Sequence, residues 1–358
     1  MINYILNKVF YALLTLFGVV TVIFLLFNVL PGDPAQMMMG QNEDSEQLAL
    51  IKQKYGFDQQ LSTQYAYYLN DLSPISFHSE NPSDYTYLSE GKYSAAKLFT
   101  ISNTTTVMKW PFLRESFTKQ GKNVSQVIAE TLPNTFVLAV SAITIAIIIG
   151  VLLGIVSALF KDHWLDKSIQ VFSTLGMSVP SFFSAILFAW FFGFVLHEYT
   201  NLEMTGSLFE LDDFGEKVEI KWKNLILPAI VLGIRPLAVV IQLMRNSLLE
   251  VFNQDYIRTA RAKGLNEFQI IRKHAVKNAL NPVVTAISGW FASMLAGAVF
   301  VEYIFGWNGL GKEIVNALNT LDLPVIMGSV LVIALVFIII NIFVDVIYAW
   351  LDPKVKLQ

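Results

Sequence analysis

Six long apolar stretches constrain this chain more than any other feature of its sequence. Five of them contain no Asp, Glu, Lys or Arg, and the sixth carries only Arg235 and Arg245. Because a helix needs roughly 20 predominantly apolar residues to cross a bilayer, each stretch is long enough for a membrane span. The stretches are Val9–Leu30, Thr135–Phe160, Ile169–Leu196, Leu225–Leu249, Ala279–Val301 and Leu323–Val344, the last continuing in a predicted helix to about residue 350. The sequence therefore predicts an all-α polytopic membrane protein with six transmembrane helices.

The composition agrees with this prediction. Of 358 residues, 54% are hydrophobic and only 15% are charged, which is too apolar for a water-soluble globule. Cysteine is absent, which excludes disulfides, thiolate metal sites and cysteine nucleophiles. No small-residue cleavage site follows the first stretch, so we expect a retained membrane anchor rather than a cleaved signal peptide.

The distribution of Lys and Arg predicts the orientation in the membrane. With a cytoplasmic N-terminus, the short inner segments hold eleven bases and the short outer loops hold four. The inner bases are Lys8, Lys161, Lys167, six residues within 254–280, Lys354 and Lys356, and the outer ones are Lys217, Lys221, Lys223 and Lys312. Because short cytoplasmic loops are enriched in Lys and Arg, we expect both termini to be cytoplasmic.

This orientation predicts three parts. Residues 1–30 form the first transmembrane helix, and residues 31–130 form an extracytoplasmic cap with helical-looking segments at 45–57 and 61–72. Residues 131–358 form a core of five helices with spans at about 135–160, 169–196, 225–249, 279–301 and 323–350. A cytoplasmic helix pair, residues 254–280, joins the fourth span to the fifth.

The segment 254–280 is basic and carries signals for two short helices. Asp255 is expected to cap a first helix that runs to Lys263, and Gly264 suits the left-handed residue that ends it. Asn266 and Gln269 form a capping-box pattern that begins a second helix.

One face of the second helix is apolar, because Leu265, Phe268, Ile271 and Ala275 recur at helical spacing. Such a face fits either a protein groove or the lipid surface. The small residues Ala260, Ala262 and Gly264 permit close approach of another backbone and favour the protein groove.

The segment "GWNGLGKE", Gly306–Glu313, matches the first seven positions of a phosphate-binding P-loop. Glu313 occupies the position where Ser or Thr would hold magnesium, and its carboxylate would repel phosphate. We interpret the segment as a turn that caps a short outer helix over about 312–319. The four histidines are scattered without ligand spacing, so we expect no metal, no cofactor and no catalytic site.

Three residues within the spans are candidates for a pathway or gate. Arg235 lies near the middle of its span, where an ionisable group suggests function by default. It could instead pair between helices or bond carbonyl groups that Pro228 and Pro236 leave free. Arg245 lies in the same span, and Pro180 kinks the third span.

The helix pair also resembles a known family. Arg258-Thr259-Ala260, followed by Gly264, is similar to the "EAA…G" loop of ABC importer membrane subunits, which docks on the ATPase. The stretches "DYIRTARAKGL" and "HAVKNALNPVVT" resemble the peptide and nickel importer permeases with a long outer loop after the first span. Further similar motifs are "LPGDP" (30–34), "YGFDQQLSTQY" (55–65), "LPNT" (132–135), "SVPSF" (178–182), "RNSLLEV" (245–251), "VEYIFGWNGLG" (301–311) and "LDPKVK" (351–356).

Three features depart from the family pattern. Arg258 and Thr259 replace the Glu and first Ala of the general motif, as is common in the peptide subfamily. Asn308 stands where that subfamily usually has proline. About residues 74–112 match nothing in the pattern and look like an insertion.

The resemblance implies a permease subunit of an ATP-driven peptide importer in a bacterial inner membrane, with nickel chelate and glutathione as alternative substrates. Implied partners are a second homologous permease, two cytoplasmic ATPases and an extracytoplasmic substrate-binding protein, besides the lipid bilayer but no nucleic acid. The implied ATPase-coupling residues are Tyr256, Arg258, Thr259, Ala260, Ala262, Lys263, Gly264, Leu265 and Phe268. A rival of another class is an ion-coupled secondary transporter, which should carry ionisable groups at the bilayer midplane, where only Arg235 qualifies.

Overall fold

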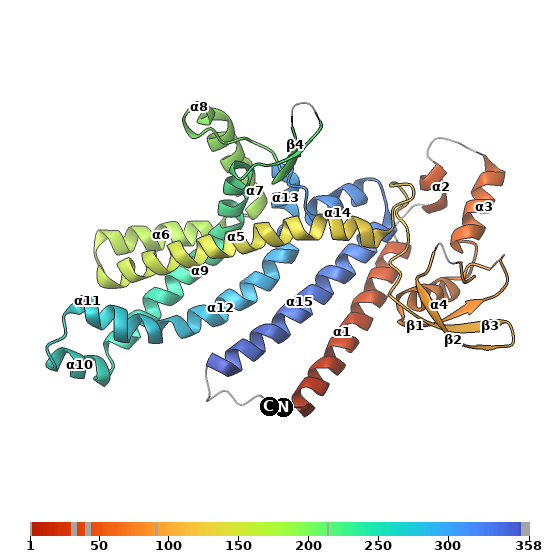
Figure 1. Cartoon of the computed structure of the whole chain (residues 1–358). Helices are drawn as coiled ribbons and strands as arrows, with labels where there is room; N and C mark the ends of the chain where they lie inside the picture. Colours follow the sequence, from red (N-terminus) through yellow and green to blue (C-terminus); the bar gives the residue numbers. More distant parts are fainter. Residues whose placement is uncertain are drawn as a thin grey trace. The chain divides into compact units, whose positions relative to one another are not determined.

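The computed structural model in Figure 1 describes residues 2–29, 34–39, 44–82, 84–89, 92–212 and 215–351. Except for Pro34, the "LPGDP" segment lies outside these residues. The bases Lys354 and Lys356 and all of "LDPKVK" except Leu351 also lie outside them.

Most of the described chain is helical, and four of its helices are long and apolar enough to cross a membrane. They are α1 (Ile2–Val29), α5 (Val124–Leu159), α9 (Lys223–Phe252) and α15 (Leu323–Leu351). The shorter helices are α2 (Pro34–Met39), α3 (Ser45–Tyr55), α4 (Leu61–Leu72), α6 (Trp164–Ser178), α7 (Ser181–Trp190), α8 (His197–Thr200), α10 (Asp255–Ala262), α11 (Glu267–Ile270), α12 (Val276–Gly297), α13 (Val299–Phe305) and α14 (Leu310–Asn319), with π-helical turns η1 (Phe191–Val195) and η2 (Ile271–Ala275). Two bent helix pairs raise the number of candidate spans to as many as six.

The third predicted span is not one continuous helix. It divides into α6 and the α7–η1 segment, whose axes are bent by 109°. Val179 is extended (φ −79°, ψ 130°) because a residue that precedes proline avoids the helical region, and Pro180 has no N–H to continue the helix. The prediction of a single helix over Ile169–Leu196 is therefore wrong.

The fifth predicted span is also bent. The helical run from Glu267 to Leu295 meets α13 at an angle of 57°.

The chain is not all-α as predicted. Strands β1 (Ile75–Ser79), β2 (Ala95–Ile101) and β3 (Thr104–Lys109) form an antiparallel sheet in the order β1-β3-β2. A second antiparallel pair joins β4 (Phe209–Leu211) to β5 (Val218–Ile220). The central strand β3, "TTTVMK", is rich in β-branched residues, which favour a pleated surface. The three-stranded sheet occupies the segment 74–112 that looked like an insertion.

The chain divides into two compact units, which we describe separately. The first comprises residues 1–8, 131–313 and 335–358, and the second comprises residues 9–130 and 314–334.

In the first unit, α5 and α9 cross at very short range. A Cβ atom on Gly154 would lie 2.7 Å from Met244 Cβ and 2.9 Å from the Ile241 carbonyl oxygen. A Cβ atom on Gly150 would lie 2.7 Å from a methyl group of Val240. Small residues allow two membrane helices to pack this closely, so these glycines set the distance between α5 and α9.

In the second unit, α4 packs on α1 through aromatic rings. Phe24 lies 5.0 Å from Tyr65 and 5.8 Å from Tyr68 between ring centroids. The Tyr65 hydroxyl and the Thr21 hydroxyl are 2.6 Å apart, and Met327 of α15 joins the same buried cluster. The two helices expected early in the cap are present as α3 and α4.

A buried carboxylate organises the rest of this unit. Asp71 accepts hydrogen bonds from Arg114 Nε (2.9 Å), the Tyr85 hydroxyl (2.8 Å) and the Tyr93 hydroxyl (3.2 Å). Burial, together with the charge of Asp71, raises the pKa of Tyr93 and keeps its hydroxyl a donor. The Asp71 side chain thereby joins α4 to the segment between β1 and β2 and to the segment that follows β3.

We expect Gly154→Ala to destabilise the protein by roughly 1–3 kcal/mol, because the added methyl group overpacks the α5–α9 contact. Thermal unfolding of the purified chain in detergent measures the effect. Gly18→Ala is the matched control, since a Cβ atom there meets nothing within 4 Å. Equal melting temperatures for the two variants would contradict the role of Gly154.

Candidate functional site

The segment 254–280 contains two helices joined by a left-handed glycine, as predicted, although the second continues through η2 into α12. Gly264 has φ +79° and ends the first helix. Asn266 and Gln269 form the expected capping box. The N-terminal cap of α10 differs from the prediction, because the capping position is held by Gln254 and Asp255 is the first residue of the helix. The Asp255 carboxylate pairs instead with Arg258 at 3.4 Å.

The inner face of this helix pair is buried against the chain itself. Ile257, Ala260, Ile270 and Ala275 join one apolar cluster. This cluster also contains Met244 and Leu248 of α9, and Ala279 and Val283 of α12. The helix pair is therefore fixed to two membrane helices by apolar contacts.

The predicted apolar stripe of the second helix is only partly correct. Leu265 and Ile271 are partly buried and Ala275 is buried, but Phe268 has 69% of its surface exposed. The turn η2 explains the difference, because a π-helical turn bonds residues five apart and shifts the helical phase. Ile270, five residues before Ala275, thereby takes the buried position.

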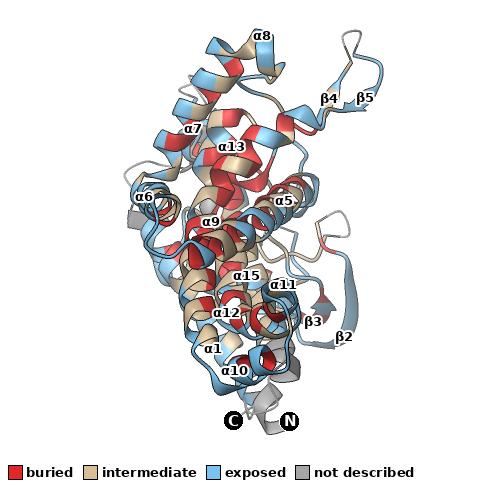
Figure 2. Cartoon of the chain, turned by 90° about the vertical axis from the view of Figure 1, so that its left-hand side faces the viewer, coloured by how far each residue is buried: buried red, intermediate tan, exposed pale blue. Residues whose placement is uncertain are grey.

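We define the outer face of the helix pair as Tyr256, Arg258, Arg261, Lys263 and Phe268, all of which are exposed. Arg261 Nε donates to Glu267 Oε1 at 3.0 Å, which joins the two helices across the Gly264 turn. Asn278 Nδ2 donates to the Tyr256 hydroxyl at 2.9 Å. Figure 2 shows that exposed residues cover most of α10 and α11. Aromatic and cationic side chains thus share one solvent-facing surface.

The nine predicted coupling residues divide by burial. Thr259, Ala262 and Gly264 are exposed together with Tyr256, Arg258, Lys263 and Phe268, whereas Leu265 is partly buried and Ala260 is buried. Ala260 therefore contacts its own chain in this structure.

Arg245, predicted as a pathway or gate residue, forms an ion pair. Its Nε and Nη2 atoms donate to the two carboxylate oxygens of Asp166, both at 2.7 Å. Asp166 also accepts from the Ser157 hydroxyl (2.5 Å) and the Asp162 N–H (3.0 Å). This cluster joins α5, α6 and α9. Sequence reasoning missed Asp166, and no local pattern reveals a partner 79 residues away.

Arg235 lies at a small cleft near the break between α6 and α7. The cleft has a volume of about 120 Å³, and Val179, Ser181, Ser184 and Ser293 line it together with Arg235. Within the described residues the Arg235 guanidinium has no hydrogen bond or ion pair, so the expected pairing is not found there. Pro180 positions this cleft by ending α6.

The Gly306–Glu313 segment is a turn that leads into a helix, as interpreted, although α14 begins at Leu310. The buried Glu302 carboxylate accepts from the N–H groups of Gly311 (2.6 Å) and Lys312 (3.2 Å). A Cβ atom on Gly309 would collide with that carboxylate. Glu302 thus caps the start of α14.

This turn contacts another motif of the sequence analysis, "LPNT". Trp307 Nε1 donates to the Asn134 carbonyl oxygen (3.0 Å), and Asn134 Nδ2 donates to the Asn308 carbonyl oxygen (2.7 Å). The Leu310 N–H donates to the Thr135 hydroxyl at 2.8 Å. Two segments more than 160 residues apart are thus hydrogen-bonded to each other. The Asn308 N–H also donates to the Ser207 hydroxyl (3.1 Å), a bond that proline could not make.

We expect Asp166→Ala to destabilise the chain by roughly 1–3 kcal/mol, because it leaves a partly buried arginine without its partner. The double variant Asp166→Ala with Arg245→Met should recover part of this loss. Thermal unfolding in detergent measures both. Asp255→Ala, which removes an exposed ion pair, is the control and should leave the melting temperature unchanged. Additive losses in the double variant would contradict the pairing.

Known proteins resemble this chain over nearly its whole length. Residues 150–357 match the family described as binding-protein-dependent transport system inner membrane component, and residues 1–81 match the N-terminal part of such a component. A protein of Brucella suis biovar 1 with the name of a peptide permease is 34% identical, over 99% of each chain. The dipeptide transport system permease protein DppB of Alkalihalophilus pseudofirmus is 31% identical, over 99% of this chain and 100% of its own length.

Two further similar proteins are a relative named for a different substrate and a solved structure with a similar fold. The glutathione transport system permease protein GsiC of Salmonella choleraesuis is 31% identical, over 99% of each chain. A solved chain of the inward-facing MetNI methionine ABC transporter is 17% identical, with a TM-score of 0.50, over 63% of this chain and 97% of that chain. This last likeness concerns the fold alone. The family match covers more than half of the chain and the relatives cover nearly all of it, so the chain belongs to the family of binding-protein-dependent transport system inner membrane components.

Proposed function

We propose that the chain is the permease subunit of an ATP-driven peptide importer and forms half of its translocation pathway. The observation that carries this proposal is the helix pair α10–α11. Its inner face is packed on α9 and α12, whereas its outer face exposes Tyr256 and Phe268 among basic side chains. A partner that pulls or pushes on this outer face would move two membrane helices directly.

The energy for transport is proposed to come from two cytoplasmic ATPase subunits that bind the outer face. The P-loop-like segment supports an external source of energy. The N–H groups of Gly311 and Lys312 already bond the Glu302 carboxylate, which occupies the side of the turn where a phosphate would need to bind.

The remaining parts of the proposed assembly follow from the family. A second homologous permease would complete the pathway, and a substrate-binding protein would deliver the substrate from outside. We place both termini and the helix pair in the cytoplasm, because the inner segments hold eleven bases against four outside.

Peptides are the proposed substrates, because two of the reported relatives are named for peptide or dipeptide transport. Glutathione, itself a short peptide, is the alternative favoured by the third relative. Arg235 is the residue that we propose to line the pathway. Its exposed guanidinium, unpaired within the described residues, could bind the carboxylate of a passing peptide beside the serine hydroxyls of the cleft.

We expect Phe268→Ala to weaken binding of the ATPase subunits by roughly tenfold or more, because exposed aromatic side chains are common energetic centres of interfaces. The measurement is copurification of the ATPases with the full permease pair, followed by ATP-dependent peptide uptake in proteoliposomes. Folding should be unaffected, since Phe268 packs little against its own chain.

Tyr199→Ala is the matched control, because Tyr199 is an exposed aromatic residue on α8, outside the helix pair. It should retain full ATPase binding and uptake. Normal ATPase binding by Phe268→Ala would argue against the outer face as the coupling surface. Uptake driven by a proton or sodium gradient without ATP would establish the secondary-transporter alternative instead.

A further inference from the structure

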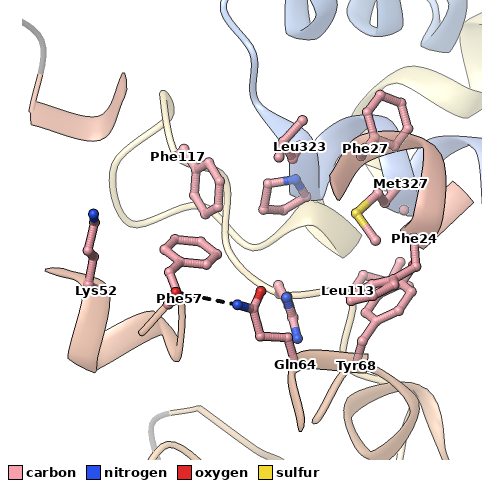
Figure 3. Close-up of a pocket in the computed structure, with 13 residues that line it drawn as sticks. Phe24, Phe27, Lys52, Phe57, Gln64, Tyr68, Leu113, Phe117, Leu323 and Met327 are labelled. Carbon is pink, nitrogen blue, oxygen red and sulfur yellow. Dashed lines mark hydrogen bonds between the residues drawn. The ribbon is translucent and has the colours of Figure 1, made fainter. Parts of the chain in front are cut away.

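The second unit contains a cavity of about 310 Å³ that differs in character from one end to the other. Phe24 and Phe27 of α1, together with Leu323 and Met327 of α15, form an apolar end. The polar lining comes from Lys52, Gln64 and Arg114 of the cap, with Phe57 and Phe117 on the same side as Lys52. Figure 3 shows Lys52 on the opposite side of the cavity from Phe24, Phe27 and Met327. The cavity is therefore amphipathic and within the range of sizes of small-molecule sites.

The apolar end lies where two candidate membrane spans terminate. The first apolar stretch of the sequence, residues 9–30, ends shortly after Phe27, and the last one begins at Leu323. Both helices contribute to one buried cluster with Tyr68 of α4. Span ends mark the boundary between the hydrocarbon and the lipid headgroups, so the cavity is at the depth where a lipid changes from apolar to polar.

The polar wall offers donors suited to a phosphate. Arg114 uses its Nε atom to bond Asp71, and within the described residues its two Nη atoms have no hydrogen-bond partner. Tyr68 and Tyr85 hold the guanidinium in place, with centroid distances of 5.2 Å and 5.6 Å. A fixed guanidinium matches the geometry of phosphate oxygens, and the Lys52 ammonium adds a second positive charge.

We propose that this cavity binds an anionic phospholipid from the membrane leaflet on the side of the cap. The phosphate would contact Arg114, the positive charge of Lys52 would favour an anionic headgroup, and the start of an acyl chain would pack against Phe24, Phe27 and Met327. A bound lipid would contact α3, α4 and the segment 113–117 and also the ends of α1 and α15, and would so hold these elements together. This proposal depends on the chain being embedded in a membrane and is independent of the coupling to ATPases.

The test is native mass spectrometry of the purified full chain in mild detergent with added phosphatidylglycerol or phosphatidylcholine. We expect one phosphatidylglycerol to be retained and phosphatidylcholine to be lost. Lys52→Glu should weaken retention by roughly tenfold, because it reverses a charge that lines the cavity and would repel an anionic headgroup. Lys54→Glu, the same change two residues along α3 and outside the cavity lining, should retain the lipid.

A second variant tests the apolar end. Leu323→Trp should exclude the acyl chain and reduce retention without changing any charge. Each variant is first compared with the unchanged chain by thermal unfolding without added lipid, so that misfolding is recognised.

Three outcomes would overturn the proposal. Equal losses in Lys52→Glu and Lys54→Glu would show general attraction by surface charge. Equal retention of phosphatidylcholine, which carries the same phosphate but no net charge, would remove the selectivity for an anionic headgroup that Lys52 and Arg114 are proposed to provide. Displacement of phosphatidylglycerol by a short peptide would identify the cavity as a substrate site.

Discussion

Close contact between α5 and α9 is the interaction on which the first unit depends. Gly150 and Gly154 leave no room for side chains at the crossing, so α9 is held against α5 over successive turns. From this position α9 extends Arg245 to Asp166 and presents Met244 and Leu248 to the helix pair. The contact between α5 and α9 thus fixes the position of α9, to which the proposed coupling surface is attached.

Apolar contacts hold the helix pair to α9 and α12, whereas polar contacts hold the turn at Gly264 that joins its two helices. Ile257 and Ile270 are buried, and Arg261 and Glu267 bridge the turn at the surface. Salt screens exposed ion pairs but does not weaken apolar burial by screening. At high salt the attachment to α9 and α12 should therefore persist, while the Arg261–Glu267 ion pair across the turn weakens.

Sequence patterns predicted those parts of the molecule that depend on local chemistry. Gly264 and the Asn266–Gln269 capping box are local features, and the structure confirms both. Long apolar runs likewise predicted α1, α5, α9 and α15. The three-stranded sheet was missed because motif matching gave no account of the segment 74–112.

Other parts depend on contacts between distant residues, which no local pattern contains. The ion pair of Asp166 with Arg245 spans 79 residues, and a helical crossing brings it together. Pro180 indicated a kink, but a local pattern does not give its size, which is a 109° bend in the structure. Glu302 follows directly after the fifth predicted span in the sequence, and only the fold places the start of α14 beside it.

The π-helical turn η2 has a consequence for the alignment of any docked partner. A π-helical turn holds about one residue more than an α-helical turn, and each residue of an α-helix corresponds to about 100° of rotation. The turn lies between Phe268 and the membrane helix α12. Its extra residue therefore acts as an angular offset that sets the direction in which Phe268 points relative to the membrane. Deleting one residue from Ile271–Ala275 would keep every outer-face side chain and still turn that face away from its partner.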